Sequence, residues 1–152
     1  MTTQFDVATG SGLPIDPGER RLHAAREAFE ALCEIRRLMN TDAADPLATP
    51  ALWERCQAVR AVALTLEANG LAPSALDSQG VRVATGYCVE DVPDRGGVVR
   101  VRWVGPSGSG VRFDQQRALQ QCEQVLTGCG WTALLYRGPR RQWYLEVEAL
   151  SL

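Results

Sequence analysis

The stretch from Val81 to Val147 constrains the fold most, because the period of its apolar residues changes twice along it. Two segments alternate apolar and polar residues, VRVATGYCVEDV and VVRVRWV; an amphipathic segment follows, DQQRALQQCEQVLTGCG, and then WTALLY and QWYLEV. Alternation at every second residue is typical of strands with one buried face, and spacing of three and four is typical of a helix. The order predicts a ββαββ unit, a four-stranded, largely antiparallel sheet with one helix packed on a face.

Two amphipathic helices are predicted before this stretch. The dipeptides Asp16-Pro17 and Thr49-Pro50 each place an N-cap residue before a proline at the first helical position. Apolar residues then recur every three or four positions, and Asn69-Gly70 gives the second helix a stop signal. Because the break between them is short, the segments predict an antiparallel helical hairpin over residues 16–70. Arginines of the first helix, Arg36 among them, are predicted on its solvated exterior.

These patterns place the chain in the α+β class. At 152 residues it suits one domain, or one small domain with an appended helical piece. Residues 1–15 are small and polar without a period, so we expect a flexible tail there, with local docking of Phe5, Leu13 and Ile15 as the alternative. The sheet domain is expected over residues 80–149, and the helical hairpin packs either on this sheet, as one compact unit, or on a copy of itself.

The charged residues are unusual in kind rather than in balance. All sixteen Lys and Arg residues are Arg, while the formal net charge is only −2. A small net charge gives no global field that would attract nucleic acid or a membrane surface. Arg without Lys is typical of a GC-rich genome, so we expect the gene to come from a GC-rich bacterium, or from a phage or mobile element within one.

The five cysteines are an odd number and form no CxxC pair. Together with the absence of an apolar run of the ~20 residues that a membrane span needs, this favours free thiols and a cytoplasmic protein without a membrane partner. His23 is the single histidine, and the cysteine spacings do not suit a zinc site. The sequence therefore predicts no catalytic residue, no metal and no cofactor, and a protein that is not an enzyme.

A glycine-rich loop, Gly105 to Gly110, follows a predicted strand and precedes a predicted helix capped by Asp114. It is similar to the acyl-CoA loop of the GNAT acetyltransferases, whose pattern is Arg or Gln, two residues, Gly, any residue, and Gly or Ala. Here Gly105 stands at the first position, the helix is predicted to begin four residues late, and no helix separates the third and fourth strands. The resemblance implies an acyl-CoA-type transferase as a further alternative.

Arginines and aromatic residues gather around the last predicted hairpin. Arg and aromatic side chains on a sheet are the ingredients of single-strand nucleic-acid binding. Trp131 and Trp143 are in phase with buried positions, so they are predicted in the core. The candidate contacts for a nucleic acid or a partner are therefore Arg100, Arg102, Tyr136, Arg137, Arg140, Arg141 and Tyr144. Arg100 and Arg102 share the predicted solvent face with Glu146 and Glu148, which suggests cross-strand ion pairs.

The function that the sequence favours is a small interaction or regulatory protein that acts through protein contacts, most simply as a homodimer. Apolar stripes on the two helices carry this expectation, and alanines at positions 25, 28, 31, 58, 61 and 63 allow two helices to approach closely. The candidate helical interface is formed by Leu22, Phe29, Leu32, Met39, Leu52, Val59 and Leu66. Nucleic-acid binding through the Arg-rich hairpin is the alternative.

Overall fold

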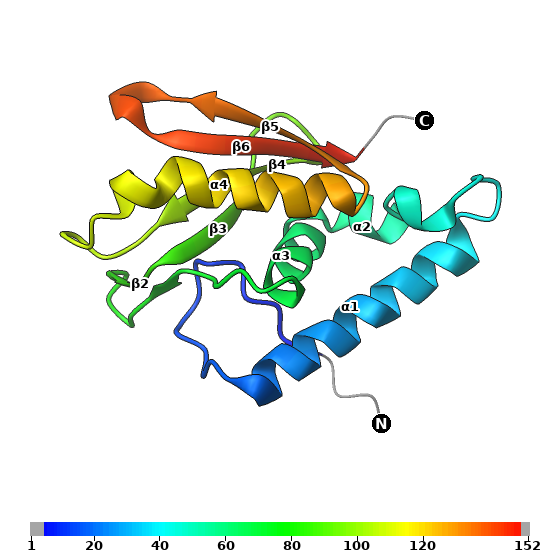
Figure 1. Ribbon diagram of the computed structural model, residues 1–152, viewed down its shortest axis with the longest axis horizontal. Helices are drawn as coiled ribbons and strands as arrows, with labels where there is room; N and C mark the ends of the chain where they lie inside the picture. The colour runs from blue at the N-terminus through cyan, green and yellow to red at the C-terminus, as the bar shows by residue number, and fades with distance from the viewer. Residues whose placement is uncertain (1–4, 150–152) are drawn as a thin grey trace.

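The computed structural model describes residues 5–149 (Figure 1). The helices are α1 (Glu19–Met39), α2 (Leu52–Cys56), α3 (Ala58–Ala68) and α4 (Val111–Gly128), with short 3₁₀ turns η1 (Pro46–Ala48) and η2 (Pro139–Arg141). The strands are β1 (Ala75–Leu76), β2 (Arg82–Ala84), β3 (Gly86–Asp91), β4 (Val98–Val104), β5 (Trp131–Arg137) and β6 (Trp143–Ala149).

The main sheet has four strands in the order β3-β4-β6-β5, and every neighbouring pair is antiparallel. Strands β3 and β4 form one hairpin, β5 and β6 form the other, and α4 connects the two. The α+β class and the ββαββ order are therefore confirmed. Strands β4 and β6 pair only between Val98 and Val101 on β4, and beyond that point the Gln115 side chain of α4 bridges the Trp103 carbonyl and the Trp143 amide.

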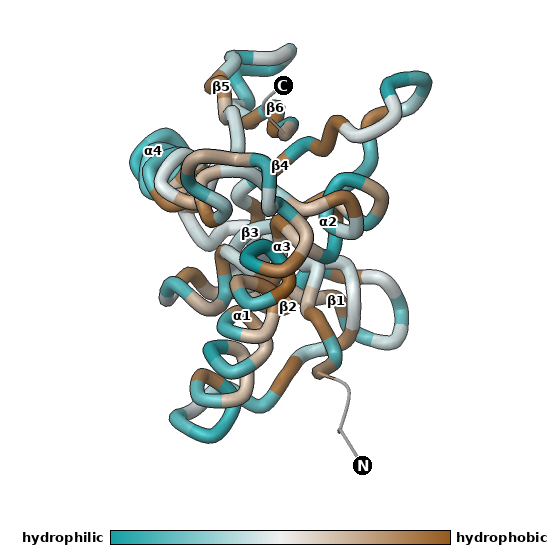
Figure 2. The backbone as a smooth tube through the Cα atoms, turned by 90° about the vertical axis from the view of Figure 1, so that its right-hand side faces the viewer, coloured by the Kyte–Doolittle hydropathy of each residue, from teal (hydrophilic) through white to brown (hydrophobic). Residues whose placement is uncertain are grey.

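The apolar face of the sheet is covered in layers (Figure 1). Helices α4 and α3 pack on the sheet and on each other, and α1 packs on α3 as an outer layer. The core joins alternate residues of all four strands to α3 and α4; its largest fully buried side chains include Trp131, Tyr87, Leu66, Leu119, Leu126 and Leu145. Hydrophilic and hydrophobic residues alternate around the coil of α1 (Figure 2), as expected for a helix that is buried on one side only.

Several element boundaries differ from the prediction. The second N-terminal helix is broken at Gln57 into α2 and α3. The first strand is interrupted at Thr85, and its early part, β2, pairs with β1 in a segment predicted as a connector. Helix α4 begins at Val111 directly after Gly110, whose left-handed backbone (φ 73°) makes the turn, rather than after Asp114. Similarly, α1 begins at Glu19 and not at the predicted Asp16 cap.

The N-terminal segment, residues 5–15, packs along β3 instead of forming a separate tail. The Val89 amide donates to the Thr9 carbonyl at 2.8 Å, and the Tyr87 hydroxyl donates to the Ala8 carbonyl at 2.8 Å. Burial raises the pKa of Tyr87, so this hydroxyl stays protonated and keeps its donor role. These backbone groups complete the outer edge of the sheet, so residues 5–15 are packed on β3 where the sequence predicts a flexible tail. Residues 1–4 lie outside the described part of the chain.

Gly10 gives a sharp test of this packing. Its backbone has φ +95°, and a Cβ added there would lie 2.2 Å from the Tyr87 carbonyl oxygen. We expect Gly10→Ala to lower the free energy of unfolding by about 2–4 kcal/mol, from left-handed strain together with overpacking against backbone. A Cβ at Gly12 meets nothing within 4 Å, so Gly12→Ala should change it by less than about 0.5 kcal/mol. Urea denaturation followed by circular dichroism measures both, and equal values would contradict the packing.

Candidate functional site

Helix α1 is held at its C-terminal end by a buried ion pair. The Arg36 guanidinium binds the Glu54 carboxylate through two hydrogen bonds, from Nε to Oε2 at 2.8 Å and from Nη2 to Oε1 at 2.7 Å. Its Nη1 donates to the carbonyl oxygens of Leu47 and Cys129, and Glu54 accepts the Ala51 amide at 2.8 Å. The two residues are 2% and 0% exposed. This network ties α1 to α2, to the loop between them and to the turn after α4.

The exterior position predicted for Arg36 is therefore wrong. A buried arginine is tolerated only when a carboxylate and further acceptors satisfy its donors. Leu32 lies one turn before it on the same face of α1 and is also buried. The sequence carries one partial signal, a glutamate at the third position of the second helix, where it accepts the N-cap amide.

A second bidentate pair holds the N-terminal half of α1. Arg21 donates from Nε and Nη2 to the two carboxylate oxygens of Glu67 on α3, at 2.8 and 2.9 Å. Its Nη2 also donates to the Asp6 carbonyl, and its guanidinium lies 4.2 Å from the centre of the Phe5 ring. The hydrogen bonds that Arg21 donates to the Glu67 carboxylate raise the pKa of Arg21, which keeps its guanidinium charged. Ion pairs therefore connect α1 near both of its ends to the α2–α3 pair.

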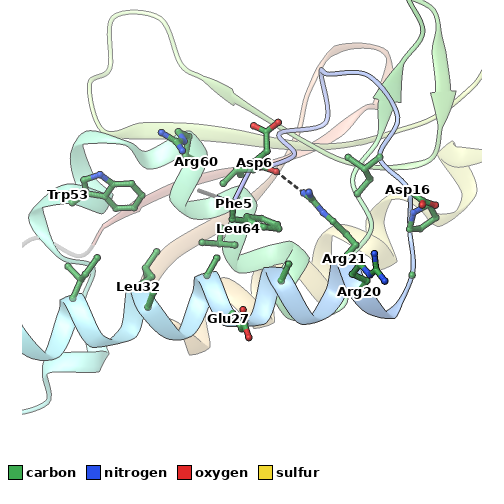
Figure 3. Close-up of a pocket in the computed structure, with 18 residues that line it drawn as sticks. Phe5, Asp6, Asp16, Arg20, Arg21, Glu27, Leu32, Trp53, Arg60 and Leu64 are labelled. Atoms are coloured by element: carbon green, nitrogen blue, oxygen red, sulfur yellow. Dashed lines mark hydrogen bonds between the residues drawn. The ribbon is translucent and has the colours of Figure 1, made fainter. Parts of the chain in front are cut away.

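An apolar groove lies along α1, between this helix, the N-terminal segment and the start of the α2–α3 pair (Figure 3). Its volume is about 890 Å³. The α1 side runs from Arg20 to Ile35, four turns or roughly 22 Å of helix. The buried side chains of Leu32 and Leu64 lie at its base, and Trp53 lines one end while remaining 43% exposed.

The wall that α1 presents to the groove is made of small side chains. Ala24, Ala28 and Ala31 line it at spacings of four and three, so they share one face of the helix. Phe5, Val7 and Ile15 of the N-terminal segment contribute apolar side chains from the opposite side. We refer to this surface as the α1 groove. It is lined by residues 5–7 and 15–18, by Arg20, Arg21, Ala24, Glu27, Ala28, Ala31, Leu32 and Ile35 of α1, and by Trp53, Arg60 and Leu64.

Charged side chains form the rim of the α1 groove. Asp6, Asp16 and Glu27 carry negative charge, and Arg20 and Arg60 carry positive charge (Figure 3). Within residues 5–149, the guanidinium groups of Arg20 and Arg60 make no hydrogen bond or ion pair. An apolar floor with a mixed polar rim, an exposed tryptophan and an arginine free to pair is the usual composition of a protein-binding surface.

The predicted helical interface is only partly on this surface. Leu32 and Leu66 are buried in the core of the same chain, so they are not available to a partner. Leu22, Phe29 and Val59 are half-buried, while Met39 and Leu52 are 63% and 68% exposed. Of the seven residues, Leu32 alone lines the α1 groove. Ala28 and Ala31, two of the alanines predicted to allow close helix approach, lie on the groove face of α1, whereas Ala25 is buried in the core. The contributions of the N-terminal segment and of Trp53 have no local signal in the sequence.

The predicted arginine and tyrosine contacts lie on the sheet face away from α4. The Tyr136 and Tyr144 rings stack with centroids 5.6 Å apart, and the Arg100 guanidinium lies 4.4 Å from the centre of the Tyr144 ring. The predicted ion pairs have other partners: Arg102 binds Glu90, and Glu146 binds Arg95 instead of Arg100. Arg100 opposes Glu146 in the register, but its guanidinium turns onto the tyrosine ring.

The remaining predicted arginines are at the tip of the β5–β6 hairpin. Arg137 stacks on Trp143, with 5.6 Å between the guanidinium carbon and the ring centre. Arg140 and Arg141 are exposed in left-handed backbone conformations, with φ of 61° and 60°. Trp131 is buried as predicted, and Trp143 is partly buried.

Other chemistry-bearing groups do not gather into a second site. Within residues 5–149, no group of three or more His, Cys, Asp and Glu side chains is arranged to hold a metal ion. His23 is exposed and pairs with Glu27, and burial raises the pKa of Cys122 to about 12. None of the helices in this part of the chain has both the length and the apolarity to cross a membrane.

The glycine loop, Gly105 to Gly110, lies between β4 and α4. The strand before the loop, β4, and the strand after α4, β5, are separated by β6 in the sheet. The helix follows the loop directly, which corrects the late start predicted from Asp114. Comparison of the whole chain with protein-family models, with curated proteins and with solved structures finds no match in any of the three.

Proposed function

We propose that the chain is a small interaction protein that binds an amphipathic helix of a protein partner in the α1 groove. The observation that carries this proposal is the groove itself, an apolar channel of about 890 Å³. One of its walls is formed by four turns of α1, which is held by buried or half-buried ion pairs near both ends. The proposed role is regulatory or adaptor-like, with no reaction performed by the chain.

The shape of the groove favours a helix over a compact small molecule. Small-molecule sites enclose most of the ligand surface, whereas Ala31, Ile35 and Trp53 at this site remain exposed. A length of roughly 22 Å matches about 15 residues of helix. Alanines at spacings of three and four leave room for the side-chain ridge of a second helix, at the 8–10 Å axis separations of packed helices. These features correspond to the recognition of a helix through residues spaced i, i+3, i+4 and i+7.

The charges on the groove rim predict which charged residues the partner helix carries. Arg60 lies at the Trp53 end of the groove (Figure 3), so a carboxylate is expected on the partner above it. Basic side chains are expected along the rest of the partner helix, opposite the carboxylates of Asp6, Asp16 and Glu27. The same acidic residues disfavour nucleic acid in the groove, and the sheet face with Arg100 and Arg102 likewise carries glutamates.

Photo-crosslinking tests the proposed function and finds the partner. A benzophenone amino acid at Glu27, on the groove rim, should crosslink in native host extract to a peptide with apolar residues at helical spacing, which mass spectrometry maps. The matched control is Glu30, which is exposed on the same helix but does not line the groove. Equal crosslinking from the two positions, or adducts only on segments without helical apolar spacing, would contradict the proposal.

A further inference from the structure

We propose a second interaction surface, the outer edge of β5, where the strand pairs antiparallel with β5 of a second copy of this chain. The two four-stranded sheets would join into one sheet with a two-fold axis at Leu134. This inference is independent of the α1 groove, which lies on other elements.

One edge strand of the sheet, β3, is hydrogen-bonded to other segments of the chain, and the other edge strand, β5, is open on its outer side. At the β3 edge, the Tyr87 amide donates to the Ala72 carbonyl at 3.0 Å, the Ser74 amide donates to the Tyr87 carbonyl at 2.9 Å, and the Val89 amide donates to the Thr9 carbonyl. That edge is therefore covered by the chain itself. Within residues 5–149, β5 pairs with β6 alone, and its other side has no strand beside it.

The backbone groups that face outward from β5 follow from two hydrogen bonds. The Gly138 amide donates to the Gln142 carbonyl at 2.6 Å, while the Trp143 amide points to the other side of β6 and donates to Gln115 at 2.9 Å. Hydrogen-bonded pairs alternate in an antiparallel ladder, so the even-numbered residues of β5 bond to β6. The amides and carbonyls of its odd-numbered residues, Trp131, Ala133, Leu135 and Arg137, face outward.

This edge lacks the features that normally prevent strand pairing. Natural edge strands are protected by charges, prolines, bulges or short length. Strand β5 has an unbroken register with β6 over seven residues, no proline, and no charged residue before Arg137. Two of its apolar side chains on the face away from α4 are exposed, Leu134 at 53% and Tyr136 at 40%.

A second copy fits this edge in one favoured register. Outward-facing odd residues must pair with each other, and a two-fold axis at Leu134 pairs Ala133 with Leu135 and Trp131 with Arg137 of the second copy. All seven residues are then used, no like charges oppose each other, and the two Leu134 side chains cover one another. An axis at Ala133 would instead leave Tyr136 and Arg137 without partners. Self-complementarity of this kind is what a two-fold interface requires.

Engineered disulfides test this register directly. Across the axis, Leu134 forms a non-hydrogen-bonded pair with itself, for which Cα atoms lie about 4.5 Å apart, within the range that a disulfide spans. In a chain whose exposed Cys56 is replaced by Ser, Leu134→Cys should form a covalent dimer on mild oxidation. Tyr136→Cys alone should not, but an equimolar mixture of Tyr136→Cys and Thr132→Cys should.

The oligomeric state gives the second readout. The unmodified chain is expected to sediment as a dimer at micromolar concentration, and Leu134→Arg should sediment as a monomer with an unchanged circular dichroism spectrum, because this side chain is exposed in the single chain. A monomeric unmodified chain would overturn the proposal, and so would crosslinking of Tyr136→Cys alone as efficient as that of Leu134→Cys. Neither result bears on the α1 groove.

Discussion

Replacing Arg36 with leucine is expected to lower the free energy of unfolding by about 3–5 kcal/mol, because it leaves a carboxylate buried without its counter-charge. Glu54 is fully buried, and its two carboxylate oxygens accept hydrogen bonds from the Arg36 guanidinium at 2.7 and 2.8 Å. The same substitution also leaves the Leu47 and Cys129 carbonyls without their donor. Guanidinium denaturation followed by circular dichroism measures the loss.

The control for this substitution lies next to it in the sequence. Arg37 pairs with Glu34 on the exposed side of α1, and exposed pairs contribute about 0–1 kcal/mol. Arg37→Leu should therefore be nearly neutral. The double variant Arg36→Leu with Glu54→Leu should be more stable than either single variant, since it removes both buried charges. Similar losses for Arg36→Leu and Arg37→Leu would show that the buried pair does not hold α1.

The sheet and its helix could be predicted because their pattern is local. Alternation in VVRVRWV and QWYLEV, with a period change in the segment between them, depends on residues a few positions apart. Burial of Val99, Val101, Leu145 and Val147 agrees with that alternation. Boundaries were less accurate where a turn needs an unusual backbone, as at Gly110 before α4.

The candidate site could not be predicted in the same way, because it is assembled from distant segments. Phe5, Trp53 and Leu64 meet α1 only after the chain has folded, and no period links them. The sequence predicts a flexible tail at the N-terminus because nothing local shows that this segment hydrogen-bonds to β3, about eighty residues away in the chain. The sequence pattern likewise predicts an exposed Arg36, because the acceptors of its guanidinium come from three other segments of the chain. Sequence patterns report local burial, and these contacts are long-range.

The second large effect is expected from filling the α1 groove. Ala31 lines the groove and is exposed, so Ala31→Trp places an indole where the partner helix must lie, with little cost to folding. We expect the affinity for the partner helix to fall roughly 100-fold, about 2.7 kcal/mol. Glu30→Trp adds the same side chain to an exposed position outside the groove and should bind with the affinity of the unmodified chain.

Isothermal titration calorimetry of this pair of variants tests the proposed function most directly. The titrant is the synthetic helix whose sequence is mapped by crosslinking from position 27. Binding in the α1 groove predicts a Kd about 100-fold higher for Ala31→Trp and an unchanged Kd for Glu30→Trp. Equal affinity of Ala31→Trp and the unmodified chain, with both folded by circular dichroism, would contradict it.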